Sequence, residues 1–194
     1  SLGQTVVVEN IGGGSGIPAA QNVVRSAPDG YTIFITSNTT HASNQSMLKR
    51  VPYDAVADFE PITKLGTITL ALVGHPSVAA NTVQELVALI NASPGKFSYA
   101  SAGVGTGAHL TGELFKTMTG TYMVHLPYRG SAPAVSDLLA GNTNVMFDNL
   151  PSALPHIKSG RLKALAVTSR VRSPALPDTP TVEEAANLKG FDAS

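Results

Sequence analysis

The feature that most constrains the fold is an alternation of short apolar runs with amphipathic segments between residues 96 and 167. The amphipathic segments have helical spacing, since Val135, Leu138 and Leu139 fall on one face of a helix that opens at Ser131. Strands that alternate with helices are typical of an α/β protein with a largely parallel sheet. The strands predicted here cover residues 96–100, 122–126, 145–147 and 162–167, and the helices 107–118, the segment after Ser131, and 153–159.

The first half of the chain contains further predicted elements. Strands are expected at residues 6–9, 31–36 and 65–73, and helices at residues 18–26 and before Lys49. Thr82 and Glu85 form the pattern of a capping box before a helix over residues 83–91. From Arg170 onward the chain is rich in proline, and no closing element is expected there.

Composition removes several classes of function. The 13 Lys and Arg residues balance 13 Asp and Glu residues, so there is no basic stripe and nucleic acid is not an expected partner. The absence of cysteine excludes disulfides, thiolate catalysis and Cys-ligated zinc. The longest strongly apolar stretch, residues 68–73, is too short to span a bilayer, so we expect no direct membrane insertion.

A glycine-rich loop with Gly103, Gly105 and Gly107 follows one predicted strand and opens a helix. Glycines let the backbone approach a ligand closely, and the free N–H groups at a helix start attract anions. The dinucleotide fingerprint needs an acid at the end of the next strand, and residues 124–127 carry none. No Lys-Ser/Thr pair follows, which excludes a nucleoside-triphosphate loop. A small anionic ligand and a purely structural tight turn remain the alternatives; the same two hold for the glycine cluster at residues 12–16.

Catalytic and metal sites are disfavoured. No G-x-S-x-G elbow of a Ser-His-Asp hydrolase occurs in the chain. His109 and Glu113 have the spacing of metal ligands on one helix face, but no H-E-x-x-H motif accompanies them, and we expect no metal. His41 lies in a loop rich in Ser, Thr and Asn, a placement that favours ligand contact.

Polar residues follow several of the predicted strands. In an open α/β sheet ligands collect at the carboxyl ends of the strands, so these residues are expected to converge on one crevice. Apart from Asp148 and Arg129 they are neutral hydrogen-bonding groups, which favours a binding protein over a catalyst. The segments concerned are Ser37 with Asn38, residues 101–106, residues 128–131, and Asp148 with Asn149.

An ordered set of short motifs resembles the Bug family, the extracytoplasmic solute receptors of tripartite tricarboxylate transporters. Each motif alone is weak, but together they run along nearly the whole chain. They are VVEN at residues 7–10, APDGYT at 27–32, VPYD at 51–54, DF at 58–59, YASAG at 99–103, HL at 109–110, PYRGS at 127–131, FDN at 147–149, LAVT at 165–168 and LPDTPT at 176–181.

The resemblance implies a non-enzymatic, two-lobed periplasmic binding protein that closes on a small carboxylate without a cofactor. It implies delivery of that ligand to membrane transporter subunits or to a sensor protein. Carboxylates of this kind are held mainly by backbone amides, hydroxyls and bridging waters. The ligand-binding residues expected from the strand ends and the resemblance together are Ser37, Asn38, His41, Ser101, Gly105, Thr106, His109, Tyr128, Gly130, Ser131, Asp148 and Asn149.

The resemblance also predicts the domain organisation. Residues 1–73 are expected to form part of lobe 1, residues 74–168 lobe 2, and residues 169–194 a crossover back towards lobe 1. Family members begin with a further strand and a Pro-Gly-Gly carboxylate loop, and they continue past residue 194, so lobe 1 is expected to be incomplete. An effector-sensing module for a signalling partner and a small α/β hydrolase are the alternative functions.

Overall fold

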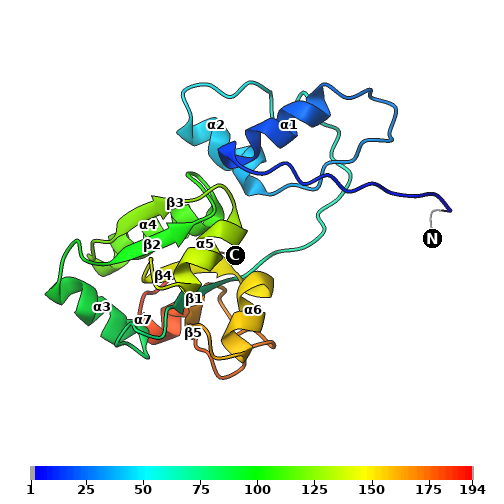
Figure 1. The fold of residues 1–194 in the computed structure, drawn as a ribbon. Coiled ribbons are helices and arrows are strands. Elements are labelled where there is room, and N and C mark those ends of the chain that lie inside the picture. The colour runs from blue at the N-terminus through cyan, green and yellow to red at the C-terminus, as the bar shows by residue number, and fades with distance from the viewer. Residues whose placement is uncertain (1–2, 194) are drawn as a thin grey trace. The chain divides into compact units, whose positions relative to one another are not determined.

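The chain divides into two compact units in a computed structural model, which describes residues 3–193 (Figure 1). Unit 1 is Ser1–Pro61 and unit 2 is Ile62–Ser194. Ser1, Leu2 and Ser194, the outer ends of the predicted first lobe and crossover, lie outside the described residues. Each unit is described by itself.

Unit 2 is built on a five-stranded mixed sheet in the order β3-β2-β4-β1-β5. β2 is parallel to β3 and β4, whereas β1 is antiparallel to β4 and β5. The predicted α/β class is confirmed, with the parallel arrangement confined to β3-β2-β4. The other pairings are antiparallel because β1 is inserted in the opposite direction between β4 and β5. The strands are β1 Leu70–Gly74, β2 Ser98–Ser101, β3 Val124–Pro127, β4 Val145–Asn149 and β5 Lys163–Val167.

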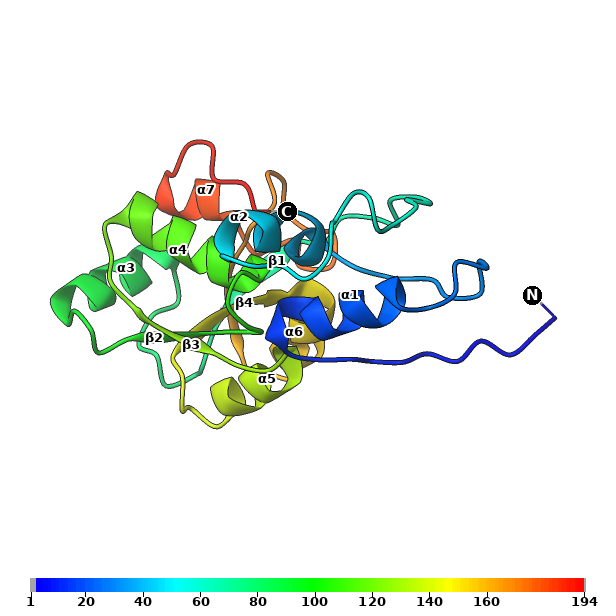
Figure 2. The ribbon, with the colours of Figure 1, turned by 90° about the horizontal axis from the view of Figure 1, so that it is seen from above.

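Helices cover both faces of the sheet, with α3, α4 and α7 on one face and α5 and α6 on the other (Figure 2). Every residue of β1 is buried, as expected for a strand with two covered faces. Side chains alternate between the two resulting cores, so that Leu72 joins one core and Val73 the other. The helices are α3 Val83–Ala92, α4 Gly107–Thr119, α5 Ser131–Leu139, α6 Leu150–Lys158 and α7 Val182–Ala186.

The boundary between the units differs from the one predicted for the lobes. β1 lies inside the unit 2 sheet, because it is hydrogen-bonded to a strand on each side. Residues 169–193 also pack on unit 2, where Phe191 is buried and the Thr168 hydroxyl donates to the Ala193 carbonyl. This segment contains α7, an element that the sequence reading did not expect.

Unit 1 is held together by a small polar core. Tyr53 is buried and donates from its hydroxyl to the carbonyl of Thr40 at 2.7 Å, while the Asn44 amide donates to the carbonyl of Ser15 at 3.0 Å. Its regular elements are a 3-10 turn at Gly14–Gly16, α1 Ile17–Val24, a π-helical turn at Thr39–Ser43 and α2 Asn44–Met47.

The strands predicted for residues 6–9 and 31–36 do not form in unit 1. Both runs lack any ladder among residues 3–61. Their apolar side chains are exposed, Val7 by 79% and Tyr31 by 92%. A strand needs a hydrogen-bonded neighbour, and neither run has one in the described part of this unit.

Candidate functional site

Three parallel strands place their carboxyl ends side by side at one edge of the unit 2 sheet. In this register Ser101 is paired with Pro127, and Ala100 with Met146. Backbone bonds join the loops beyond the strands, since Tyr128 N–H donates to Ser101 O at 2.9 Å and Gly130 N–H to Ala102 O at 3.1 Å. We call this edge, with the loops after β2, β3 and β4, the polar edge. It brings together the predicted ligand residues of unit 2.

The glycine loop at the polar edge is a tight, internally bonded turn. Ser101 is fully buried, and its hydroxyl accepts a bond from the amide of Gly103 at 3.2 Å. The hydroxyl of Thr106 donates to the carbonyl of Gly103 at 2.7 Å. Gly103 and Gly105 have φ of +143° and +80°, a region that side-chain-bearing residues rarely adopt. The glycines are therefore required by the backbone path that leads into α4.

Three helices begin at the polar edge without a side-chain cap. The N-cap residues of α4, α5 and α6 are Thr106, Gly130 and Asn149, and none of them makes a side-chain cap hydrogen bond. In contrast, Thr82 and Thr181 cap α3 and α7 with their hydroxyls. The first N–H groups of a helix have no partner within the helix and carry its positive dipole end.

The three helix starts differ in the number of backbone N–H donors that their first turns leave for a ligand. In α6 the Leu150 N–H already donates to Thr69 O, and Pro151 has no N–H. In α5, Pro133 removes one donor of the first turn. The start of α4, which has no proline, presents the most complete set of backbone donors.

Asp148 is the one predicted ligand residue with a charge, and it is buried rather than presented at the surface. Its Oδ1 accepts a hydrogen bond from the Ser131 hydroxyl at 2.6 Å, which ties β4 to the start of α5. Its Oδ2 has no hydrogen-bond partner within residues 3–193. Burial raises the pKa of Asp148, although the bond from Ser131 opposes the shift. Asn149 next to it is exposed.

Tyr128 contributes its backbone to the polar edge and its hydroxyl to α5. The hydroxyl donates to Asp137 Oδ2 at 2.7 Å. Burial and this bond raise the pKa of Tyr128 to about 12, so the phenol stays neutral. The prediction of Tyr128 as a ligand residue therefore depends on its backbone and ring rather than on a free hydroxyl.

The predicted residues of unit 1 lie on the π-helical turn or directly before it. Ser37 and Asn38 are exposed, and so they stay candidates for ligand contact. His41 packs against the rings of Phe34 and Phe59, which also contact each other, and its Nδ1 lies 2.9 Å from the Thr40 hydroxyl. These contacts give His41 a structural role in this unit.

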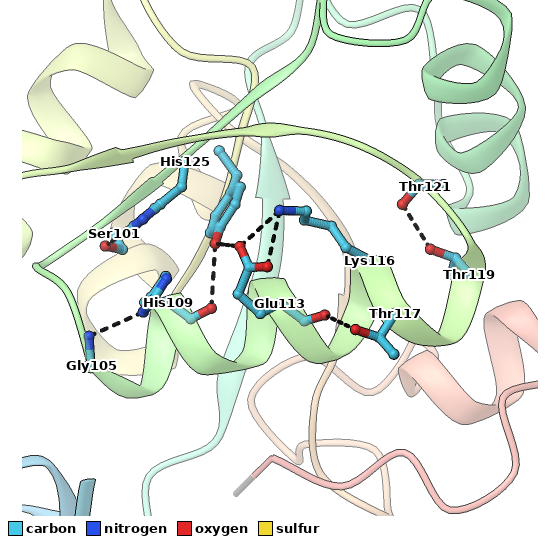
Figure 3. Close-up of polar contacts among 10 residues, drawn as sticks. Ser101, Gly105, His109, Glu113, Lys116, Thr117, Thr119, Thr121 and His125 are labelled. Carbon is cyan, nitrogen blue, oxygen red and sulfur yellow. Dashed lines mark hydrogen bonds and ion pairs between the residues drawn. The ribbon is translucent and has the colours of Figure 1, made fainter. Parts of the chain in front are cut away.

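Beside the glycine loop lies a stack of three rings that was not predicted from the sequence. Tyr99, His125 and His109 stack in that order, with ring centroids 4.8 Å and 4.1 Å apart. His125 Nε2 lies 2.6 Å from the Ser101 hydroxyl, and Gly105 N–H donates to His109 Nδ1 at 3.0 Å (Figure 3). Each imidazole therefore holds one group of the loop.

An ion pair between Glu113 and Lys116 lies at the Tyr99 end of this stack. The Tyr99 hydroxyl donates to Glu113 Oε1 at 2.5 Å, and Lys116 donates to both oxygens of Glu113, at 2.8 and 3.0 Å. Burial alone would raise the pKa of Glu113, but the bonds from Lys116 and Tyr99 outweigh it and hold that pKa below its usual value. Glu113 thus serves as an ion-pair and hydrogen-bond partner, and no cluster of metal-ligating side chains occurs in the described part of the chain.

The contact between Ser101 and His125 has the distance of a nucleophile and its general base. Ser101 is nevertheless fully buried, and its hydroxyl is engaged with the backbone of Gly103. A substrate carbonyl cannot reach such an oxygen without opening the loop. The geometry favours loop support over nucleophilic catalysis.

Comparison with known proteins finds relatives of this chain in sequence and in overall fold. BugT of Bordetella pertussis is 39% identical over 185 residues, which are 95% of this chain and 57% of BugT. The solved structure of R. palustris Rpa4515 with adipate has a TM-score of 0.95 at 35% identity and covers 98% of this chain and 64% of that one. MatC (Rpa3494) from Rhodopseudomonas palustris with bound malate has a TM-score of 0.90 at 28% identity, covering 98% and 65%.

The chain spans a little over half the length of the curated relatives that it matches, 57% in the case of BugT. No helix among residues 3–193 has the length and apolar character to cross a membrane. The family model described as tripartite tricarboxylate transporter family receptor matches residues 1–194. This chain therefore belongs to the TctC family of tripartite tricarboxylate transporter receptors.

Proposed function

We propose that this chain is the carboxylate-binding part of a periplasmic receptor that captures a small organic acid for a tripartite tricarboxylate-type transporter. The family is one of receptors, and two structural neighbours contain adipate and malate. Both of these ligands are dicarboxylates, which supports a small dicarboxylate as the ligand class.

The observation that carries the proposal is the set of uncapped helix starts at the polar edge. The protein has a formal net charge of zero, so an anion is attracted by local groups, such as helix dipoles, rather than by a bulk positive field. One helix start stabilises a nearby anion by roughly 0.3–1 kcal/mol, or about 2 kcal/mol where the site is partly buried. A carboxylate that bridges the starts of α4 and α5 would add direct hydrogen bonds from backbone amides.

A single substitution can place a carboxylate of the protein itself at this helix start. Thr106→Asp places a carboxylate at the N-cap of α4, where aspartate is a favoured capping residue. The variant loses the hydrogen bond from the Thr106 hydroxyl to the Gly103 carbonyl but gains a favoured N-cap, so it is expected to fold and to lose ligand binding by competition and repulsion. Thr82→Asp is the matched control, because it makes the same change at the N-cap of α3, which already has a side-chain cap.

The measurement is thermal or urea unfolding with and without adipate, with uncharged adipamide as the chemical control. Ligand at 100 times Kd adds about 2.7 kcal/mol to the free energy of unfolding. With adipate we expect this gain in the free energy of unfolding for the wild type and for Thr82→Asp, but not for Thr106→Asp. With adipamide we expect no gain for any of the three proteins. A wild type that responds to no acid in a panel of mono-, di- and tricarboxylates would contradict the proposal.

A further inference from the structure

The two stacked imidazoles are the link between the glycine loop and the interior of unit 2. His125 comes from β3 and lies beside Tyr99 of β2, its partner in the sheet register. His109 comes from the first turn of α4 and covers the other face of His125. Figure 3 shows both rings between the loop residues Ser101 and Gly105 on one side and Glu113 with Lys116 on the other.

The hydrogen bonds define where a proton can be placed on this stack. Gly105 N–H donates to His109 Nδ1, so that nitrogen has no hydrogen in the bonded state. A proton added to Nδ1 would bring two donors face to face, and the Gly105 amide would have to turn away. His125 Nε2 shares a short contact with the Ser101 hydroxyl, which is also bonded to Gly103. The two rings therefore contact two groups of the loop, the Gly105 amide and the Ser101 hydroxyl.

Burial and the surrounding charges together favour the neutral state of both rings, with Glu113 acting in the opposite direction. Burial lowers the pKa of His109, and Glu113 opposes that shift while Lys116 supports it. Burial and the nearby His109 lower the pKa of His125 to about 4. The attraction of Glu113 is weakened because Lys116 and Tyr99 already bind its carboxylate. Two rings with centroids 4.1 Å apart also strongly disfavour a double positive charge.

We propose that His109 and His125 are positioning residues that hold the glycine loop in its ligand-binding form only while His109 Nδ1 carries no proton, so that carboxylate affinity falls on acidification. The inference rests on the function proposed above. A simple attraction between an imidazolium and an anionic ligand predicts the opposite sign of the pH dependence, so the sign distinguishes the two mechanisms.

The test measures the Kd of adipate by calorimetry between pH 8 and pH 5 for the wild type and matched variants. His109→Asn keeps an acceptor in the place of Nδ1 but does not titrate, whereas His109→Ala has no acceptor. His125→Gln keeps a hydrogen-bonding group near the place of Nε2. His75→Asn is the control, because His75 follows β1 at the opposite end of the sheet, where Gly74 is paired with the first residue of β4.

We expect wild-type affinity to fall at least threefold more than that of His109→Asn between pH 7.5 and pH 5, within the limit of about tenfold per pH unit for one proton. Protonation of adipate itself affects the affinity of the wild type and of His109→Asn equally, so the comparison between the two proteins removes this contribution. At pH 7.5 His109→Ala should bind more weakly than His109→Asn, and His75→Asn should follow the wild type at every pH.

The outcomes separate this inference from the proposed function. If the wild type binds adipate but His109→Asn and His109→Ala both match its affinity and pH profile, only the positioning role is overturned. An affinity that rises on acidification overturns it as well. If the wild type binds no carboxylate of the panel at any pH, the proposed function fails first.

A measurement on the wild type alone guards against variants that do not fold. In an NMR titration, the imidazole signals of His109 and the backbone amide of Gly105 should shift with one shared midpoint below pH 6.5. A Gly105 amide that does not respond when His109 titrates would overturn the inference without any substitution.

Discussion

Gly112 on α4 is the position where one added methyl group has the largest expected effect. A Cβ at this residue would lie 2.3 Å from Cε2 of Tyr99, 2.8 Å from Cζ and 2.9 Å from Cδ2. The Tyr99 ring cannot move away easily, because it is fully buried, stacked on His125 and bonded to Glu113. Gly112→Ala is therefore expected to destabilise unit 2.

The magnitude follows from opposing contributions. Replacing glycine by alanine inside a helix stabilises it by roughly 0.5–1 kcal/mol. Overpacking of a core typically costs about 1–3 kcal/mol. Displacing an aromatic ring from its stack costs about 0.5–1.5 kcal/mol more. The net expectation is a decrease of about 1–3 kcal/mol in the free energy of unfolding.

Urea unfolding followed by far-UV circular dichroism measures this difference. Gly107→Ala is the matched control, since it lies at the start of the same helix and its added Cβ would meet only Leu70 Cδ1, at 3.9 Å. With a slope of about 2 kcal/mol/M, the midpoint of Gly112→Ala should fall by roughly 0.5–1.5 M. If Gly112→Ala were as stable as the wild type, Tyr99 could not lie against the backbone of α4, and the support of the stack would need another explanation.

Two further predictions concern ionisable groups, the buried Asp148 and the partly buried His125. Asp148→Asn should raise the free energy of unfolding at pH 7, because burial raises the pKa of Asp148 above its ordinary 3.8 and its charged form destabilises the fold at higher pH. That gain should shrink as the pH falls towards 4 in urea titrations, and a loss at pH 7 would contradict the assignment. Burial lowers the pKa of His125 from 6.5 to about 4, so the folded state loses stability as the pH falls from 6.5 towards 4. Between pH 7.5 and pH 5 this loss should be about 1 kcal/mol after allowance for partial exposure, and His125→Gln should lack it; equal losses in both proteins would refute the expectation.

The elements of unit 2 could be predicted where local signals decide the structure. Apolar runs bounded by turn residues predicted β2 to β5, and helical spacing predicted α4 and α5. Direction and partners in the sheet are set by contacts distant in sequence, and so the antiparallel insertion of β1 was not predicted. The five-residue α7 gives too short a periodic signal, although Thr181 and Glu184 form a capping box at its start.

The candidate site was predictable to the extent that it follows from strand direction. Parallel strands end at the same edge, which correctly placed Ser101, Tyr128, Ser131 and Asp148 near one another. The stack of His125 on Tyr99 depends on the register of β2 and β3, and no local pattern fixes that register. Tyr99 and His125 are each the second residue of the observed strand, a match that appears only once the strand bounds are known.

The uncapped helix starts have a consequence for how such a receptor diversifies. Donors that belong to the main chain are retained through most amino-acid replacements, so the carboxylate binding proposed above would not depend on a few irreplaceable side chains. Substitutions at exposed neighbouring positions such as Val104 and Asn149 would then change the selectivity for the remainder of the acid without removing these donors. One inherited scaffold could in this way supply receptors for acids of different length, each altered only where the ligand differs.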